Sequence, residues 1–301
     1  MRLQHTLSIF FALSLTSQFL LASDETGGQS GAFLRRGVGS RALAMGNAYT
    51  SVANDASALY WNPAGLPQIK NAELLGMYSI LSFDRQQLFV SFANSFSDAF
   101  TLGVGWFKFG VTNIDGRDAF GNPTQKFDDS QNSFMLSLGK AFGDVAVGVT
   151  GKYLNHFLFD QSATGFGVDV GTNILFFNTV RVGLVVQDIA GQLRWNTESS
   201  LKETLPLTTR AGLSVHPDFV PVVIAAEIVK VGGADPVYRA GGEWSIVEFF
   251  GVRAGYDSEN VAFGGFARMP GEAFSVQVDY AATRDVLENQ FVHHVSLRLD
   301  F

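Results

Sequence analysis

The side chains that could perform catalysis are few in this chain of 301 residues. The sequence contains no cysteine, which excludes disulfides, thiolate metal sites and a cysteine nucleophile. Beyond the N-terminal segment the histidines are His156, His216, His293 and His294. Neighbouring residues of a strand point to opposite faces, so His293 and His294 cannot both serve one metal or catalytic site. A Ser–His hydrolase site at a strand end is a minor alternative; otherwise we expect no enzyme, no cofactor and no metal site.

One short motif has the spacing of a phosphate-binding loop. Residues 37–42, GVGSRA, match the G-x-G-x-x-A pattern of dinucleotide-binding folds. That pattern binds phosphate only between the strand and the helix of a βαβ unit, and no such unit is predicted around it. Walker, H-E-x-x-H and G-x-S-x-G motifs are absent from the sequence. The net charge of −7 and a pI near 5.2 also exclude a nucleic-acid-binding surface.

Charged residues, which are only 16% of the chain, often alternate with apolar ones. Residues 295–301, VSLRLDF, place their apolar side chains on one face and Ser, Arg and Asp on the other. This pattern is typical of strands with one apolar and one polar face, and we expect the polar faces to form Arg–carboxylate pairs. The predicted charge network comprises Arg181, Arg210, Glu227, Arg239, Glu243, Arg253, Asp279 and Arg298, with Asp169, Asp279 and Asp300 as the expected partners of Arg181, Arg253 and Arg298.

About fourteen alternating segments follow residue 70, and about twelve is the alternative count. Two architectures fit: a soluble sandwich or barrel with its apolar face inward, or a membrane barrel with its apolar face outward. The polar face is rich in glycine, of which the chain has 32, as a narrow lumen requires. We therefore predict an all-β fold, a transmembrane antiparallel β-barrel of about 14 strands. The segments are 73–79, 87–94, 100–110, 131–140, 144–156, 165–176, 180–188, 207–216, 222–229, 237–244, 249–257, 261–268, 274–282 and 291–301.

The connections between these segments alternate in length. The long ones, Val111–Ser130 and Ile189–Pro206, both fall at odd positions in the order of connections, whereas short turns such as 141–143 and 177–179 fall at even positions. Outer-membrane barrels have long outer loops and short periplasmic turns. We therefore expect Val111–Ser130 and Ile189–Pro206 to be outer loops.

The N-terminus has the features of an export signal. Arg2 precedes an apolar run over 7–21, and Ala22 and Ser23 follow it, as in a secretory signal peptide. We predict a signal peptide over 1–23, a lumen plug over 24–70 and the barrel over 71–301, in the outer membrane of a Gram-negative-type bacterium. Outer-membrane lipids and the barrel-assembly machinery are the expected partners, with the terminal Phe301 as the assembly signal.

Residues 37–66 break the alternation and carry short helix and turn signals instead. The stretches that stand out are GSRA at 39–42, MGNA at 45–48, NDASA at 54–58 and YWNPAGL at 60–66. Together they resemble the N-terminal signature of PorV/PorQ-type outer-membrane proteins and of the related FadL-like (long-chain fatty-acid transporter) superfamily. The resemblance implies a fourteen-stranded barrel plugged by this partly helical segment, and shorter loops than in fatty-acid transporters place the chain nearer the PorV/PorQ-type side. The expected plug or gate residues are Gly46, Asn47, Asp55, Asn62, Pro63, Ala64 and Gly65.

Three functions are consistent with a plugged barrel. The first is passage, or lateral delivery, of hydrophobic small molecules, with Gly103, Gly105 and Gly110 bending a strand to open a side exit. The second, which the PorV resemblance implies, is an accessory role in a type IX-like protein-secretion system, with secreted proteins as partners. The third is a structural barrel without a ligand. We favour transport slightly over secretion, and expect no nucleic-acid partner.

Overall fold

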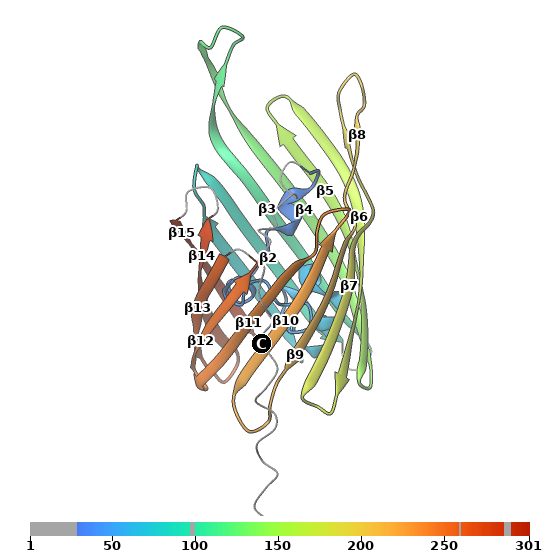
Figure 1. The fold of residues 1–301 in the computed structure, drawn as a ribbon, viewed down its shortest axis with the longest axis vertical. Coiled ribbons are helices and arrows are strands. Elements are labelled where there is room, and N and C mark those ends of the chain that lie inside the picture. Colours follow the sequence, from blue (N-terminus) through green and yellow to red (C-terminus); the bar gives the residue numbers. More distant parts are fainter. Residues whose placement is uncertain (1–28, 97–99, 259, 286–289) are drawn as a thin grey trace, which may run out of the picture.

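The computed structural model describes residues 29–96, 100–258, 260–285 and 290–301. Fourteen antiparallel strands form a closed barrel, which confirms the predicted fold class (Figure 1). Strand β15 closes onto β1 and β6 pairs with β7, so the sheet has no free edge around the barrel. The short β8 pairs only with β7 and stands outside this count. In the described part of the chain no helix is both long and apolar enough to cross a membrane. The predicted signal peptide, 1–23, lies outside the described residues.

The barrel strands agree with the predicted segments in number and in order. Their bounds are β1 Ala72–Ile80, β2 Arg85–Phe96, β3 Phe100–Arg117, β4 Pro123–Phe142, β5 Val145–Leu158, β6 Gln161–Phe176, β7 Val180–Trp195, β9 Thr208–Val215, β10 Val222–Val231, β11 Val237–Val247, β12 Phe250–Asp257, β13 Asn260–Met269, β14 Ser275–Asp285 and β15 Gln290–Asp300, with β8 at Lys202–Thr204. Four short helices precede them: η1 Ala32–Arg35, α1 Ser40–Ala44, α2 Ala58–Trp61 and η2 Pro63–Gln68.

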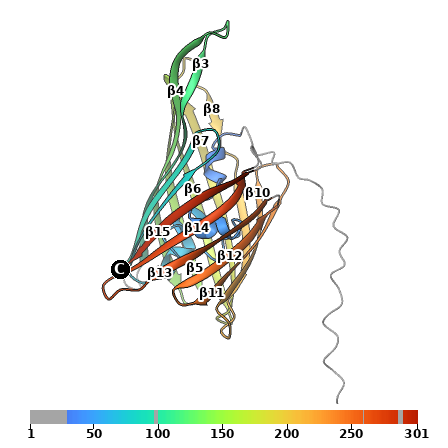
Figure 2. The same ribbon diagram turned by 90° about the vertical axis from the view of Figure 1, so that its left-hand side faces the viewer.

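The two ends of the barrel differ. The end that carries Phe301, here called the C-terminal end, has short connections such as that between β4 and β5. At the opposite end, here called the hairpin end, β3 and β4 extend far beyond the neighbouring strands (Figures 1 and 2). This corrects the prediction that Val111–Ser130 and Ile189–Pro206 are long outer loops, because much of each range is strand. The first is a β-ribbon that leaves only 118–122 as its connection, and the second continues β7 to Trp195 and contains β8.

The alternation of apolar residues does not predict the ribbon, because the ribbon has no apolar face. Beyond the rim of the barrel both faces of a two-stranded ribbon meet water, so apolar alternation is not required. Cross-strand pairs such as Asp115 with Lys126, 3.5 Å apart and largely exposed, replace it. The apolar alternation that predicts a strand therefore stops where the ribbon leaves the barrel.

Along each wall strand the side chains alternate between the lumen and the outside. On β5, Val145, Val147 and Val149 point outward and are about 40% exposed, whereas Thr150 and Leu154 point inward and are fully buried. The outward face is thus apolar and exposed, and the inward face is covered by the N-terminal segment, which lies inside the barrel.

The helices η1, α1, α2 and η2 lie inside the ring of strands, in the blue part of Figure 1. Helix α1 packs against β12 to β15, and η2 packs against β3 to β6 on the other side of the lumen. Most of residues 38–66 are buried, among them Tyr49 and Trp61, which are nearly inaccessible. This segment, residues 29–71, is called the plug below.

A belt of inward-facing glycines lets the plug backbone lie directly on the wall. A methyl group at Gly148 would overlap the Pro63 backbone, and one at Gly255 would overlap the backbone of Met45 and Gly46. Gly46 itself has a φ of 61° and lies against the Tyr256 backbone, so it needs glycine for both conformation and space. The wall residues of this glycine belt are Gly139, Gly148, Gly171, Gly183, Gly241, Gly255 and Gly264.

Candidate functional site

Wall carboxylates on two strands far apart in the barrel fix the plug. Glu227 of β10 accepts hydrogen bonds from the backbone N–H groups of Tyr49 (3.1 Å) and Thr50 (2.8 Å). Glu73 of β1 accepts one from the Ala56 N–H at 2.6 Å. Short helices leave many N–H groups without internal partners, and these carboxylates satisfy them inside the barrel. In each of these hydrogen bonds the plug supplies the donor and the wall supplies the acceptor.

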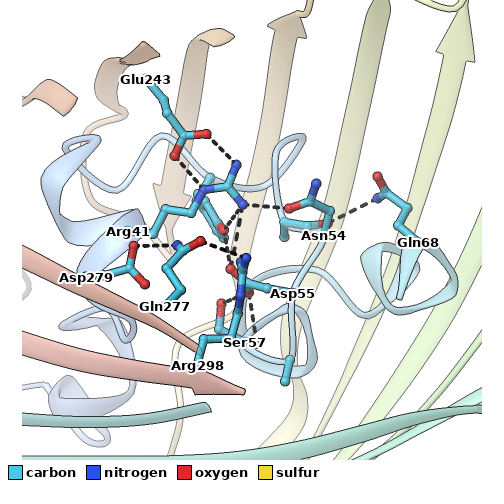
Figure 3. A network of polar contacts seen from close by, with 12 residues as sticks. Arg41, Asn54, Asp55, Ser57, Gln68, Glu243, Gln277, Asp279 and Arg298 are labelled. Atoms are coloured by element: carbon cyan, nitrogen blue, oxygen red, sulfur yellow. Dashed lines mark hydrogen bonds and ion pairs between the residues drawn. The ribbon is translucent and has the colours of Figure 1, made fainter. Parts of the chain in front are cut away.

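The side chain of Arg41 in α1 also donates from the plug to a wall carboxylate (Figure 3). Its Nε and Nη2 each lie 2.8 Å from the Glu243 carboxylate, in the two-pronged geometry that suits guanidinium and carboxylate. Its Nη1 donates to Asn54 Oδ1 at 2.7 Å and to the Tyr49 hydroxyl at 3.1 Å. On the wall, Glu243 also accepts from Arg253 Nε at 2.6 Å. One carboxylate therefore joins a plug arginine to a wall arginine.

The protonation states within the plug follow from this network. Burial alone would lower the pKa of Arg41, but the Glu243 carboxylate outweighs it and holds the pKa well above its ordinary value. Burial raises the pKa of the Tyr49 phenol well above its ordinary value. Tyr49 therefore stays protonated, and its hydroxyl donates a hydrogen bond to Asp55 Oδ2 at 2.6 Å. Neither group changes charge near neutral pH, so the network is a fixed clamp.

Asp55 and Asn62 organise the two turns of the plug. Asp55 Oδ1 accepts from the Ser57 N–H at 3.0 Å just before α2. Asn62 is fully buried, and its Oδ1 accepts from the Ala64 N–H at 3.1 Å, which opens η2 at Pro63. The Asn62 amide donates to the carbonyl oxygen of Thr50 at 3.0 Å and to the wall residue Asn173 at 3.1 Å. One side chain thus joins two plug turns to β6.

We expect Asn62→Ala to lower the free energy of unfolding by about 1–3 kcal/mol, because buried partners lose their hydrogen bonds. Denaturant unfolding of the protein reconstituted in lipid vesicles measures this. Asn122→Ala is the matched control, since Asn122 bonds Asp118 on the exposed hairpin tip and its loss should change stability by less than about 0.5 kcal/mol. Equal effects of the two variants would contradict the anchoring role of Asn62.

Toward the hairpin end the lumen is filled by apolar side chains. Phe33 of η1 stacks on Phe107 of β3 with ring centroids 5.6 Å apart, and Tyr60 and Phe89 meet the same Phe107 edge-on. Leu154 of β5 is fully buried in the same hydrophobic core. This group, called the upper apolar cluster, comprises Phe33, Leu34, Tyr60, Phe89, Phe107, Leu154, Leu193 and Leu205.

Toward the C-terminal end the lumen is polar and hollow. A cavity of about 520 Å³ lies beneath the plug, bounded above by Arg41 and Asn54 and at the side by Arg298 and Asp300. Its position opposite the upper apolar cluster gives the lumen two chemically distinct halves, with the plug between them. Within the described residues no group of three His, Asp or Glu side chains is placed to hold a metal ion.

The pairing of β6 with β7 shifts register twice within a short stretch. Phe166 lies opposite Gln192 but Val170 lies opposite Val186, so β7 has two extra residues across this stretch. The interruption contains Asp188, whose φ is 62°, and turns its side chain inward. Buried Lys152 lies 2.5 Å from Asp188 and 2.7 Å from Asp169.

The structure places most of the predicted charge network in ion pairs. Asp279 lies 2.6 Å from Arg253, and Asp300 lies 3.2 Å from Arg298. Asp169, however, contacts Lys152 and not Arg181, because Lys152 lies diagonally across from it on the neighbouring β5, whereas Arg181 lies opposite Leu175 farther along β6. Arg181 is half-buried near the C-terminal end, and none of the ion pairs found among the described residues includes it. Glu227 contacts Arg210 at 3.3 Å and Arg239 at 3.8 Å, and Glu243 contacts Arg41 and Arg253.

The glycines predicted to bend a strand have a different environment. Pairing of β3 with both neighbours is regular at Gly103 and Gly105, and the register shift of β3 lies beyond Gly110, after Val111. A methyl group at Gly105 would lie 2.8 Å from Leu59 of the plug, so this glycine makes room for a plug side chain. The terminal Phe301 is half-exposed, and its N–H donates to the Ala72 carbonyl oxygen at 3.0 Å. Its role as an assembly signal stays a prediction.

Sequence reasoning named the plug turns but missed several wall partners. Glu73, Lys152 and Asp257 each contact the plug or a buried ion pair, and Asn47 donates to Asp257 at 2.9 Å. Their inward position in alternating strands was a usable signal for Glu73 and Lys152. No sequence signal identified Asp188, because the bulge changes which face it occupies.

Comparison with known proteins rests on the fold alone. No protein-family model matches the sequence, and no curated protein matches it. The toluene transporter TodX of Pseudomonas putida superposes with a TM-score of 0.59 at 13% identity, over 87% of this chain and 96% of that one. The monoaromatic hydrocarbon channel CymD gives 0.58 at 14%, over 87% and 96%. A FadL homologue of Pseudomonas aeruginosa gives 0.58 at 10%, over 88% and 98%. The chain therefore has the fold of FadL-like hydrocarbon channels, and a PorV/PorQ-type relationship is not among these findings.

Proposed function

We propose that this protein is an outer-membrane channel that takes up small hydrophobic molecules at its hairpin end. The observation that carries the proposal is the division of the lumen into an upper apolar cluster and a polar lower half, on either side of an anchored plug. The likeness to solved hydrocarbon channels supports it at the level of fold. A molecule without polar groups is best matched by the upper half, where the upper apolar cluster lies.

The outer surface of the barrel supports a membrane location. Exposed Val147, Leu136 and Val295 belong to a wall whose outward residues are mainly apolar, whereas the inward face carries the ion pairs. Outer-membrane barrels combine an apolar outer band with a polar interior. If the hairpin end takes up molecules from outside the cell, as proposed, the C-terminal end faces the periplasm.

The plug determines what cannot pass. Its backbone lies against wall glycines on opposite sides of the lumen, and we propose that this close contact excludes hydrated solutes. A hydrophobic molecule must therefore either displace part of the plug or leave through the wall. The interrupted pairing between β6 and β7 supports a side exit there more than at Gly103, Gly105 and Gly110. A role for those three glycines in opening the wall stays a prediction.

Photoaffinity labelling tests the proposed binding region. A small hydrophobic probe with a diazirine group would be irradiated in outer membranes that contain the protein, and labelled peptides mapped by mass spectrometry. We expect labels on inward residues such as Leu154 and Leu193, protected by excess toluene. Val147 and Val149, which point outward on β5, report simple partitioning into lipid. Labels confined to the outward residues would contradict the proposal.

Phe33→Ala should raise the uptake rate of a hydrophobic probe several-fold, because it empties space in the upper apolar cluster without altering the barrel wall. Uptake by whole cells that express the variant measures this. Phe120→Ala is the control, since Phe120 is 91% exposed at the hairpin tip and contacts no part of the lumen. Unchanged or lower uptake with Phe33→Ala would count against an obstructing role for η1.

The secretion-accessory role and the ligand-free structural barrel stay predictions. The β3–β4 ribbon would be the contact surface for a secretion partner, because it extends farthest from the barrel (Figure 2). Cross-linking in intact cells followed by co-purification separates the hypotheses. Recovery of secretion subunits or secreted proteins would favour the accessory role.

A further inference from the structure

The cavity at the C-terminal end is large enough for an organic molecule. Its volume of about 520 Å³ lies within the range of small-molecule sites, roughly 300–1,000 Å³. It lies under the plug, against β1 and β11 to β15, and none of the residues of the upper apolar cluster lines it. The cavity is separate from the upper apolar cluster, so what it binds does not depend on the proposed function.

Two arginines, Arg268 on β13 and Arg298 on β15, share their acceptors at the side of this cavity, across the intervening strand β14. Arg268 Nε and Arg298 Nη2 both donate to Oε1 of Gln277, at 3.1 and 3.0 Å. The Gln277 amide donates to Asp279 at 2.8 Å, which fixes its orientation (Figure 3). Asp300 is the only carboxylate that either guanidinium contacts among the described residues, 3.6 Å from Arg268 and 3.2 Å from Arg298. Two guanidinium groups thus share one carboxylate.

Arg298 retains an unused donor. Its side chain is more than nine-tenths buried, and its Nε makes no hydrogen bond although it lies 3.2 Å from Asp300. Arg268 is about one-third exposed to the cavity, and its two terminal nitrogens make no hydrogen bond in the described structure. Guanidinium groups favour planar carboxylates, which accept two parallel hydrogen bonds.

The other charges around the cavity are engaged elsewhere or lie in solvent. Glu243 contacts Arg41 and Arg253, and Glu73 accepts from the Ala56 N–H. Glu248 and Lys70 are exposed at the rim. The Arg268–Arg298 pair thus has one carboxylate in direct contact, Asp300, and Arg298 Nε is a buried donor without a hydrogen bond in this part of the cavity wall.

Apolar side chains complete the lining. Ile69 of the plug and Phe266 of β13 border the same cavity. An inorganic ion would leave these side chains without contact and most of the volume unused. A ligand with one anionic group and a small apolar body matches both parts of the lining.

We propose that this cavity binds a small organic carboxylate, with its carboxylate between Arg268 and Arg298 and its apolar part against Ile69 and Phe266. The site is distinct from the upper apolar cluster in place and in chemistry. It gives the C-terminal end of the barrel a binding specificity of its own, for anions instead of neutral hydrocarbons.

The test is a calorimetric titration of the full-length protein in nanodiscs of zwitterionic lipid. Benzoate is the probe, benzyl alcohol has the same ring without the charge, and inorganic phosphate is an anion without the ring. We expect saturable benzoate binding that weakens with added salt, and binding of the other two that is at least about tenfold weaker. Equal binding of benzyl alcohol, or of phosphate, would overturn the proposal, as would no benzoate binding.

Three variants locate the site. Arg268→Gln should weaken benzoate binding by roughly tenfold or more, and Arg268→Lys, which keeps the charge but loses the planar fork, should give an intermediate loss. Arg117→Gln on the hairpin tip is the control and should leave binding unchanged. Arg268 is partly exposed, so its replacement should spare the barrel, and heat-modified mobility on gels checks folding. Unaltered benzoate affinity in Arg268→Gln would overturn the assignment.

Discussion

Gly148→Ala should unseat the plug. The added methyl group would overlap the backbone of Pro63 and Ala64, which cannot rotate away as a side chain could. We expect a loss of about 1–3 kcal/mol in the free energy of unfolding, as for overpacking in other tight interiors. The plug turn at Asn62–Gly65 should also become accessible to protease, and single-channel recordings in planar bilayers should show openings that the unaltered protein lacks.

A control on the same strand isolates the effect of the plug. Gly151 points outward from β5, and a methyl group there would lie 4.0 Å from its nearest neighbour, the Leu136 carbonyl oxygen. Gly151→Ala should therefore leave stability, protease resistance and conductance unchanged or slightly improve stability. If both alanine variants behaved alike, close contact between plug and glycine belt would not be what holds the plug.

Glu243→Gln should have the largest effect among the polar residues. The change leaves Arg41 and buried Arg253 facing an amide, with Asp279 as the remaining carboxylate for Arg253. Removing one partner of a buried ion pair costs about 3–5 kcal/mol, because the other charge stays desolvated. Thermal unfolding in lipid vesicles and protease accessibility of α1 are the measurements.

An exposed ion pair provides the matched control for that variant. Asp115 and Lys126 lie 3.5 Å apart on the ribbon, and both side chains are more than 60% exposed. Asp115→Asn should cost less than about 1 kcal/mol. A Glu243→Gln effect as small as this would show that the plug is not held by its arginine.

The fold could be predicted because each wall strand faces two media. Apolar alternation on strands such as β5 and β15 follows directly from one face toward lipid and one toward the lumen. The ribbon at 111–130 could not be predicted in this way, because both of its faces meet water. The ion pair of Lys152 with Asp169 depends on the register between β5 and β6, and that of Lys152 with Asp188 depends on the β7 bulge. A period-two pattern encodes neither.

The plug was predictable in position but not in attachment. Its turn residues Asn62 and Gly65 stand out in the sequence, since helix and turn signals interrupt the alternation. What they contact is decided by the wall: Asn62 meets β6, and Gly65 lies against the Ala53 carbonyl oxygen of the plug itself. The sequence suggested that Gly105 weakens its strand. In the structure this glycine instead leaves space for a plug side chain.

The most direct test of the account is selective permeation. Uptake of a labelled hydrophobic probe and of a sugar of similar size would be measured in the same cells, with and without the protein, in a host that lacks its own hydrocarbon channels. Because the plug closes the lumen to hydrated solutes and the upper apolar cluster lies on the hairpin side, we predict faster uptake of the hydrophobic probe and unchanged uptake of the sugar. Faster uptake of the sugar, or no change for the hydrophobic probe, would contradict it.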